Sequence, residues 1–383
     1  MIIITLGTAY NFFRTCYIMI FTPILHDTTI HNDNVSSVSI LLPVRNEAKR
    51  VLGDCLTSLL NQDYPNYELV IVNDRSTDNS NEILQFHLHR QSCKKTILID
   101  GSPLQNNWIG KTFALQQAKV SSTGEWLLMV DADVIFKPNA VSLAMDFAEK
   151  YNLDALSLLP RVKMISVYEM FIIPIISWLS LLRVSPTQAN RTSSRKCFGY
   201  GNFILCKRHA HNAIGGFESY KSHILDDCII MEKLKLAEYN VMVCDGANLM
   251  RSRMYDSLPE IINGFTKNSF AALNNNVVNS FVAVLLIVLL AILPCIFLAK
   301  TITRMLLGYP INSLWDIVPF IFLALSVLVI GNRMKTNIYF YLLFLIGFIV
   351  SIYIIVNSTF QNKISKFVRW KDRKINSIIA NKQ

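Results

Sequence analysis

Two aspartates, Asp131 and Asp133, directly follow an uninterrupted apolar stretch over residues 126–130. The stretch predicts a buried strand, so both carboxylates are expected at its carboxyl end. Carboxylate oxygens suit hard cations such as Mg²⁺ or Mn²⁺, which in turn bind phosphate oxygens. A D-x-D string is common by chance, but its position after a buried strand favours a metal site with Asp131 and Asp133 as ligands.

A second acidic pair, Asp226 and Asp227, precedes a predicted helix over residues 228–236. When two carboxylates are neighbours, the pKa of one can rise, and that group can then act as a general base. A structural alternative is that the pair caps the helix, and we expect at least one of the two aspartates to do so. Chemistry and capping both remain open on this pattern alone.

Two further acidic residues follow the first two predicted strands, residues 38–43 and 68–72. Glu47, in the motif Pro-Val-Arg-Asn-Glu, could read the edge of a nucleobase. Taken alone, however, this motif favours a helix N-cap with an acidic first turn. Asp74 has no evident capping task, whereas Asp78 is expected to cap the helix that follows it.

A lysine, Lys111, opens a predicted helix over residues 111–120, directly after Trp-Ile-Gly. The first turn of a helix carries the positive end of the helix dipole, so a cation there is slightly unfavourable unless an anion is bound. A diphosphate would supply that anion. A solvated lysine explains the motif equally well when the motif is taken alone.

The segments that must position these residues alternate between apolar strands and helices. Such a pattern indicates an α/β fold with a mostly parallel sheet that is covered by helices on both faces. Ligands in such sheets bind beyond the carboxyl ends of the strands, where the polar clusters lie. The predicted strands are residues 38–43, 68–72, 96–99, 126–130 and 199–207, and the predicted helices are residues 48–62, 79–90 and 111–120.

Apolar segments near both ends predict membrane attachment. Residues 1–25 are interpreted as an uncleaved anchor, because the apolar run is long and no small-residue cleavage site follows it. Transmembrane helices are predicted within residues 277–357. The strongest candidate is residues 277–299, and two further candidates are residues 314–330 and 338–356.

Residues 164–182 are apolar but contain Glu169 and Pro174. A stretch of this length could span a bilayer, but the polar interruption favours a helix that lies in the membrane interface. The alternative is a core helix of the globular domain. If the segment is interfacial, it brings a lipid-like substrate to the domain from the bilayer.

The chain is basic, with a net charge of +10, and 52% of its 383 residues are hydrophobic. Residues 268–383 hold eleven Lys and Arg against two Asp and Glu, so they carry nearly all of the excess charge. Because the basic tail, residues 358–383, follows apolar segments, we expect it to face anionic lipid headgroups and not nucleic acid. Three crossings before the tail would oppose the positive-inside tendency, so either one segment is re-entrant or the tail lies outside.

Taken in order, these motifs resemble those of family-2 glycosyltransferases of the GT-A fold, a nucleotide-diphospho-sugar transferase fold with a Rossmann-like, mostly parallel sheet. The resemblance covers about residues 38–267 and rests on five motifs, each of them weak alone. It predicts a glycosyltransferase domain over residues 36–267. Two departures matter, because Asn73 stands where many relatives have aspartate and Arg75 where many have glycine, so we expect donor contacts to differ there.

The resemblance also implies a role for each polar residue. The implied donor is a UDP- or GDP-sugar, and the implied cofactor is Mg²⁺ or Mn²⁺. Asp227 corresponds to the catalytic base, with Asp226 beside it where glutamate is more usual, and Asp133 corresponds to the main metal ligand. The residues implied to contact the donor or its metal are Pro43, Glu47, Asp74, Lys111, Asp131 and Asp133.

Several details resemble one group within the family, the hopanoid-associated and carotenoid (diaponeurosporenoate-type) membrane glycosyltransferases of bacteria. These details include residues 107–111, 225–228 and 257–260 and a Trp-Lys-x-Arg ending. The Q-x-x-R-W element of processive polysaccharide synthases is missing before the membrane segments, which argues against a processive synthase.

The expected function is therefore an inverting, metal-dependent transfer of a hexose from a nucleotide diphosphate sugar to a lipophilic, membrane-associated acceptor. The alternatives are a polyprenyl-phosphate sugar synthase and an inactive membrane scaffold of the same fold. We expect a multi-pass protein of the cell membrane with a cytoplasmic catalytic domain, because nucleotide sugars are made in the cytoplasm. Eight cysteines without a C-x-x-C pair fit that reducing compartment and disfavour zinc or a disulfide framework.

Overall fold

A computed structural model describes residues 1–25, 35–90, 95–309, 314–365, 367–370 and 373–376, without the side chains of Arg90, Leu314, Ser365 and the last two segments. The chain divides into two compact units, which are treated separately below. The sheet unit contains Thr22–Lys163 and Pro186–Met254. The helical unit contains Met1–Phe21, Met164–Ser185 and Tyr255–Ile378.

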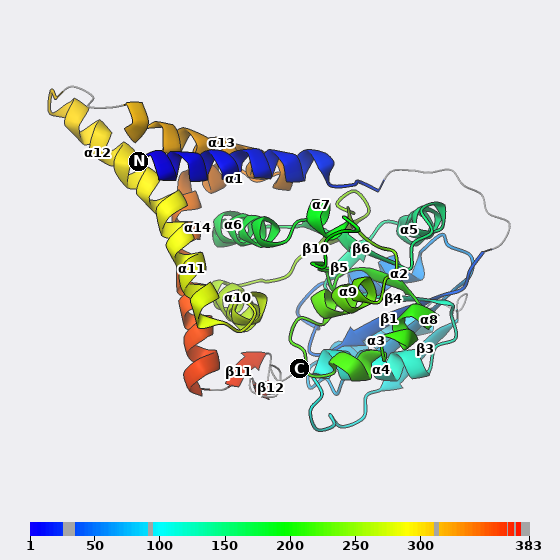
Figure 1. The fold of residues 1–383 in the computed structure, drawn as a ribbon. Coiled ribbons are helices and arrows are strands. Elements are labelled where there is room, and N and C mark those ends of the chain that lie inside the picture. The colour runs from blue at the N-terminus through cyan, green and yellow to red at the C-terminus, as the bar shows by residue number, and fades with distance from the viewer. Residues whose placement is uncertain (26–34, 91–94, 310–313, 366, 371–372, 377–383) are drawn as a thin grey trace. The chain divides into compact units, whose positions relative to one another are not determined.

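The sheet unit is built on one seven-stranded sheet (Figure 1). In spatial order the strands are β3 (Thr96–Asp100), β2 (Tyr67–Asn73), β1 (Val38–Val44), β4 (Trp126–Met129), β8 (Ile204–Lys207), β6 (Ala155–Leu159) and β9 (Val241–Asp245). The first four strands in this order pair in parallel with one another, β8 is antiparallel to both β4 and β6, and β6 and β9 are again parallel. The predicted, mostly parallel α/β sheet is therefore confirmed.

Helices cover both faces of this sheet, because alternate strand residues point to opposite sides. Ile40 and Ile71 pack into one apolar cluster with α2 (Leu52–Leu60) and α5 (Ala140–Lys150). Leu41 and Val70 pack into the other cluster with α4 (Gly110–Val120) and α9 (Asp226–Leu236). Both faces of the sheet are therefore buried, which explains why β1 and β2 are continuous apolar runs in the sequence.

Two predicted elements begin later than expected. The helix predicted over residues 48–62 begins at Leu52, because residues 47–50 form a turn closed by the Arg50 N–H donating to the Glu47 carbonyl (3.0 Å). The strand predicted over residues 199–207 begins only at Ile204. The remaining helix of the first half, α3, spans Ser80–Arg90 and matches its prediction closely.

A small second sheet continues directly from β4. It contains β5 (Val134–Phe136), β10 (Met250–Ser252) and β7 (Arg161–Val162), in the order β5-β10-β7. Only a short turn separates the end of β4 from β5, and the D-x-D string occupies this turn. The string therefore joins the two sheets.

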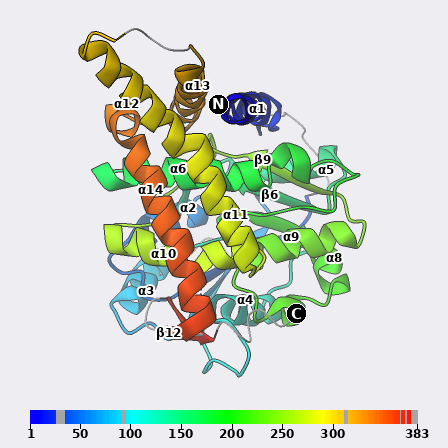
Figure 2. The same ribbon diagram turned by 60° about the vertical axis from the view of Figure 1, so that its left-hand side comes forward.

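The helical unit is built from apolar helices around a core of its own. Trp178 of α6 (Val167–Arg183) lies with its ring 5.9 Å from that of Phe348 of α14 (Ile338–Phe360), and its indole N–H donates to Thr15 Oγ1 (2.8 Å). α6 thus belongs to the helical unit and not to the core of the sheet unit. The other helices are α1 (Ile2–Phe21), α10 (Leu258–Ala272), α11 (Val277–Ile287), α12 (Leu293–Leu306) and α13 (Val318–Met334). Figure 2 shows α14 running alongside α10 and α11.

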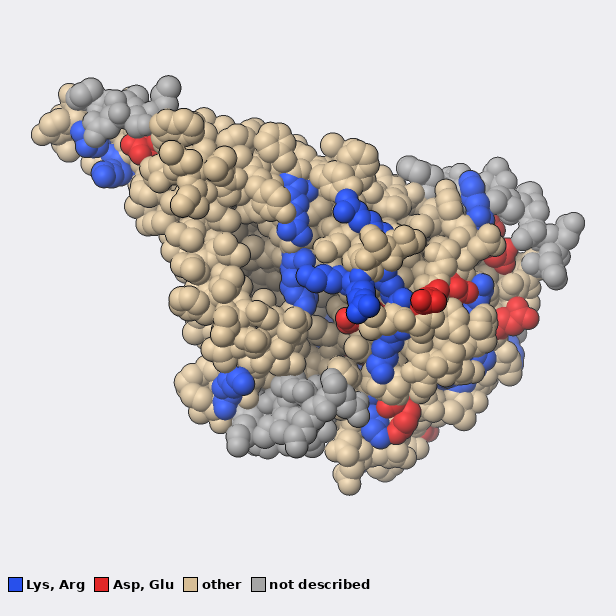
Figure 3. All heavy atoms as spheres, viewed as in Figure 1, with Lys and Arg blue, Asp and Glu red and all other residues tan. Residues whose placement is uncertain are grey.

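Among the described residues, three helices are long and apolar enough to cross a membrane, which suggests membrane association. They are Val167–Ala189, Val277–Leu306 and Ile338–Ile364, whereas Val318–Met334 is a shorter apolar helix. Figure 3 shows a surface almost free of charged atoms over α11, whose exposed side chains include Phe281 and Leu286. The anchor at residues 1–25 and a crossing at residues 314–330 stay predictions.

The basic tail contains an element that the sequence did not suggest. β11 (Phe367–Trp370) and β12 (Arg373–Asn376) pair as an antiparallel hairpin, with Arg369 opposite Lys374. Lys366 and Lys371, which belong to the same predicted basic run, lie outside the described residues. Lipid binding by this tail stays a prediction.

Candidate active site

The D-x-D string forms the turn between β4 and β5. Ala132 is buried in the sheet core, whereas Asp131 and Asp133 on either side of it are partly exposed. Asp133 is fixed at two points: Asn202 Nδ2 donates to its Oδ1 (3.3 Å), and the Arg253 N–H donates to its carbonyl oxygen (3.3 Å). A buried residue between two partly exposed ones aims both carboxylates away from the core, as a metal site requires.

The acidic pair occupies the first turn of α9. The N-cap residue is Leu225, which makes no side-chain cap, so the prediction that one of the aspartates caps this helix is wrong. Asp226 and Asp227 are the first two residues inside the helix, where their charge suits the helix dipole. Asp227 Oδ1 accepts from the Cys228 N–H (2.8 Å), and its Oδ2 accepts from the Gly201 N–H (3.1 Å).

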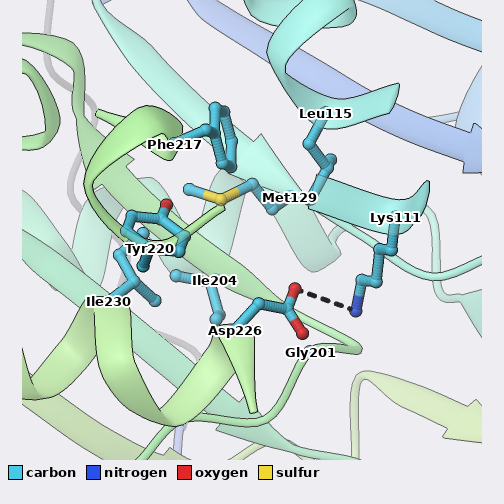
Figure 4. Close-up of a pocket in the computed structure, with 9 residues that line it drawn as sticks. All are labelled: Lys111, Leu115, Met129, Gly201, Ile204, Phe217, Tyr220, Asp226 and Ile230. Carbon is cyan, nitrogen blue, oxygen red and sulfur yellow. Dashed lines mark ion pairs between the residues drawn. The ribbon is translucent and has the colours of Figure 1, made fainter. Parts of the chain in front are cut away.

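Lys111, at the start of α4, connects the D-x-D string to the acidic pair. Its Nζ lies 2.7 Å from Asp131 Oδ1 and 3.5 Å from Asp226 Oδ2. Figure 4 shows the Lys111 and Asp226 side chains pointing toward one another beside Gly201. The alternative of a solvated lysine is therefore wrong, because the Lys111 side chain is only 19% exposed and is paired with two carboxylates.

Burial and the neighbouring charges raise the pKa of two aspartates in this region. Burial raises the pKa of Asp133, and the Asp131 and Glu47 carboxylates raise it further. Burial also raises the pKa of Asp227, to about 6, with the Asp226 carboxylate adding to the effect. For Lys111, burial alone would lower the pKa, but the surrounding carboxylates outweigh it and raise the pKa. The charged cluster of Lys111, Asp131, Asp133, Asp226 and Asp227 thus holds more negative charge than its one lysine neutralises.

The loop after β1 is fastened to the loop after β2 by hydrogen bonds. Glu47 donates its N–H to Ser80 Oγ (2.8 Å), and its carboxylate lies 3.6 Å from Arg50 Nε. The N-cap of α2 is Val51, so the expectation that the motif ending at Glu47 forms a helix N-cap with an acidic first turn is wrong. Asp78 accepts from the N–H groups of Ala48 (3.0 Å) and Ser80 (3.0 Å), and these bonds lower its pKa. The two loops, residues 45–51 and 74–79, therefore form one surface that is ordered without a ligand and is called the wall below.

Asp74 lies in the same wall but is only 3% exposed. Its N–H donates to the Val44 carbonyl (2.8 Å), and its carbonyl accepts from Arg45 Nη1 (2.6 Å). Pro43 is the sixth residue of β1 and pairs with Val72. The roles of Pro43, Glu47 and Asp74 in holding a nucleotide stay predictions.

The two departures from the family pattern have structural explanations. Arg75 has φ of +54°, a left-handed conformation that glycine adopts at no steric cost. The Arg45 guanidinium bonds the Arg75 carbonyl (3.1 Å) and thereby helps to hold this conformation. Asn73 Oδ1 accepts from the Ser76 N–H (3.2 Å), a turn-forming bond that an aspartate would also make.

Sequence reasoning missed the loop before β8, which forms the floor of the cluster. A Cβ on Gly201 would lie 2.7 Å from Lys111 Nζ and 3.2 Å from Asp131 Oδ2, so any larger residue there would displace the Lys111 ammonium. Asn202, which holds Asp133, follows it in the chain. The two glycines of the Gly-Tyr-Gly-Asn-Phe segment were the available signal, because paired glycines in an apolar stretch mark a close backbone approach.

A small pocket opens beside Lys111 and Asp226 (Figure 4). Apart from these two residues and Gly201, its lining is mostly apolar. Tyr220 is one of the lining residues, and its hydroxyl bonds His211 Nε2 (2.8 Å). The full lining comprises Lys111, Leu115, Met129, Gly201, Ile204, Phe217, Tyr220, Asp226 and Ile230.

Residues 39–227 match the family model described as glycosyl transferase family 2. The chain carries a family-2 glycosyltransferase domain. The matched segment contains both acidic motifs and Lys111 and ends at Asp227. The three side chains that the structure brings together thus all lie inside the glycosyltransferase domain.

The chain is also similar to two individual proteins, one by sequence and one by structure. A 4,4'-diaponeurosporenoate glycosyltransferase from Staphylococcus aureus (strain USA300) is 25% identical over 242 residues, which cover 62% of this chain and 62% of that protein. The structure of a mannosyltransferase from Pyrobaculum calidifontis in complex with GDP-Man and Mn²⁺ aligns with a TM-score of 0.58 at 15% identity, covering 94% of this chain and 95% of that one. This second likeness supports the GT-A fold.

Proposed function

We propose that the protein is an inverting, metal-dependent hexosyltransferase that moves a sugar from a nucleotide diphosphate sugar to a lipophilic acceptor in the membrane. The observation that carries this proposal is the bridge of Lys111 between Asp131 and Asp226. It holds the D-x-D carboxylates, the proposed site of the cation and the diphosphate, beside the partly buried acidic pair. A transferase needs these two parts adjacent, because the leaving diphosphate and the attacking oxygen meet at one sugar carbon.

The residues present fit a divalent cation at the D-x-D turn. The pKa of Asp133 is raised partly by the carboxylates of Asp131 and Glu47, so the turn holds negative charge that a cation would neutralise. Among the described residues, no three Asp, Glu, His or Cys side chains form a metal-holding group by themselves. Asp131 and Asp133 would therefore hold Mg²⁺ or Mn²⁺ together with donor oxygens. When bound, the cation supplies charge neutralisation to the diphosphate leaving group.

Asp227 is proposed as the general base. Its pKa, raised to about 6, leaves it ionised near neutral pH and still basic enough to accept a proton. The acceptor oxygen forms its bond to the anomeric carbon as the bond from that carbon to the diphosphate oxygen breaks on the opposite face. When the acceptor is a hydroxyl, its proton passes to Asp227, and the Gly201 N–H, which donates to Asp227 Oδ2, fixes the carboxylate for this transfer.

The donor is proposed to be a UDP- or GDP-sugar whose base lies against the wall formed after β1 and β2. Glu47 and Asp74 belong to that wall, with Pro43 behind it in β1. Hydrogen bonds through Asp78 hold the wall in place without a ligand. A pre-built wall favours nucleotide binding, because little conformational entropy is lost when the ligand arrives.

The acceptor is proposed to be lipophilic for two reasons. The helical unit contributes long apolar helices, and α6 interrupts the sheet unit between its two acidic motifs. The Staphylococcus aureus relative is named for a 4,4'-diaponeurosporenoate acceptor. We propose a multi-pass membrane protein with the glycosyltransferase domain in the cytoplasm.

The test is a transfer assay on the full chain in detergent, with UDP- and GDP-hexoses and Mn²⁺. Acceptors are a carotenoid carboxylic acid, a triterpenoid alcohol, a polyprenyl phosphate and a water-soluble sugar. Transfer to either of the first two, lost in Asp133→Ala and kept in the exposed control Asp54→Ala, supports the proposal. Preference for polyprenyl phosphate would replace the acceptor class, and efficient transfer to the soluble sugar would overturn the lipophilic acceptor.

A further inference from the structure

We propose that Lys111 is a built-in counter-ion for the acidic cluster, so that the divalent cation binds tightly only together with the nucleotide diphosphate. This inference rests on the proposed metal-dependent function and adds an order to its binding steps. Lys111 would neutralise the cluster while it is empty and would move to the diphosphate when the donor enters.

The geometry shows that Lys111 already occupies the cluster. Its ammonium makes a close ion pair with Asp131 (2.7 Å) and a longer one with Asp226 (3.5 Å). Asp131 is also one of the two proposed metal ligands. A cation on Asp131 would thus lie within a few ångströms of the ammonium, and like charges at that separation repel strongly in a partly buried site.

The backbone at Gly201 helps to keep the Lys111 ammonium in this position. Gly201 leaves room for Nζ, since a Cβ there would lie 2.7 Å from it. The start of α4 is itself fixed, because the Ile109 N–H donates to the Lys221 carbonyl (2.8 Å). Lys111 is therefore placed by its surroundings and does not reach the carboxylates only by chance.

A nucleotide diphosphate removes the conflict between the two positive groups. Its phosphate oxygens offer Lys111 a new anionic partner and offer the cation further oxygen ligands. Each ligand then improves the binding of the other, and the improvement is equal in both directions. Without the Lys111 ammonium, no positive group competes with the cation for Asp131. The affinity for the cation then depends less on the nucleotide.

The experiment measures Mn²⁺ binding to the full chain in detergent by the electron paramagnetic resonance signal of free Mn²⁺, with no transfer reaction. Titrations are made alone, with UDP and with GDP. Lys111→Met is expected to bind Mn²⁺ at least tenfold more tightly than wild type without nucleotide and to lose most of the enhancement that nucleotide gives. Lys111→Arg, which keeps the charge, is expected to resemble wild type.

Lys119→Met is the matched control, because it removes a lysine from the same helix that bonds Asn212 and not the cluster. It should bind Mn²⁺ as wild type does. If Lys111→Met fails to fold, Lys111→Gln carries the same expectation. Equal or weaker nucleotide-free Mn²⁺ binding after loss of the Lys111 charge overturns the counter-ion role alone. Absence of Mn²⁺ binding to wild type even with UDP or GDP overturns the metal-dependent function as well.

Discussion

The wall after β1 and β2 and the charged cluster around Lys111 are held together by different forces. In the wall, Asp78 accepts two backbone N–H groups, and Arg45 donates to two backbone carbonyls. These bonds are made within the protein and need no ligand. The wall is therefore already in the form in which it would meet a nucleotide.

The cluster, in contrast, is held mainly by charge. Three carboxylates surround the ammonium of Lys111, and burial raises the pKa of Asp227. An arrangement of this kind changes whenever a charged ligand is added or removed. The wall is therefore suited to recognise a nucleotide without changing, whereas the charged cluster is suited to change when a charged ligand binds. Four predictions separate these two behaviours.

The largest effect is expected at the D-x-D turn. Asp133→Ala should lower the transfer rate by about 10³-fold, because a cation that stabilises the leaving diphosphate lowers the activation free energy by several kcal/mol. The folded state should be unaffected, so the thermal melting midpoint should match that of wild type. Activity is measured with saturating Mn²⁺, and full activity of Asp133→Ala in the presence of a chelator would remove the cation from the mechanism.

Asp227→Asn is expected to lower kcat by about 10²- to 10⁴-fold with donor binding kept, as for the loss of a general base. In wild type, only the ionised carboxylate can accept the proton. Because burial and Asp226 raise the pKa of Asp227 to about 6, kcat should rise as pH rises through about 6 and level off above it. A kcat that stays flat between pH 5 and 7, with transfer chemistry rate-limiting, would count against Asp227 as the base.

The wall should respond to mutation in its stability. Asp78→Ala removes the acceptor of two backbone N–H groups, which costs about 2 kcal/mol for hydrogen bonds to a charged group. In a domain of this size the melting midpoint should fall by roughly 5 °C. Asp78→Asn retains one acceptor oxygen and should lose about half as much. A loss of kcat without a fall in melting midpoint would show that the wall also takes part in the chemistry.

The smallest effect is expected at Arg75. Glycine relieves the left-handed conformation, worth about 1 to 2 kcal/mol, but increases the entropy of the unfolded chain, which costs about 0.5 to 1 kcal/mol. Arg75→Gly should therefore raise the melting midpoint by about 2 °C. Arg75→Ala, which gains no conformational freedom, is the comparison, and an equal rise in both variants would assign the effect to the lost arginine side chain.

Most of the sheet and the identity of the acidic motifs could be predicted from the sequence. Strands buried on both faces are apolar throughout, so β1, β2 and β4 stood out without a structure. The position of Asp131 and Asp133 after such a strand followed directly. The structure confirms the sheet and brings Lys111, Asp131 and Asp226 together.

The rest could not be predicted, because it depends on contacts between segments that are distant in the chain. The bond from Asn202 to Asp133 spans 69 positions, and no local pattern marks it. The helix-start expectations for the motif ending at Glu47 and for Asp226–Asp227 were wrong for a related reason. Acidic residues near a helix start suit several positions of the first turn equally well, and the chain direction, set by packing, decides which one is the cap.

The way in which Asp133 is held has a mechanical consequence. Its carbonyl accepts from the Arg253 N–H, and the carbonyl of the next residue, Met254, accepts from Arg50 Nη1 (3.0 Å). At Tyr255 the chain leaves the sheet unit for the helical unit. A pull on the chain at this point reaches the peptide group of Asp133 across only two residues. A displacement of the chain at Met254 would thus act on the backbone of Asp133, one ligand of the proposed cation.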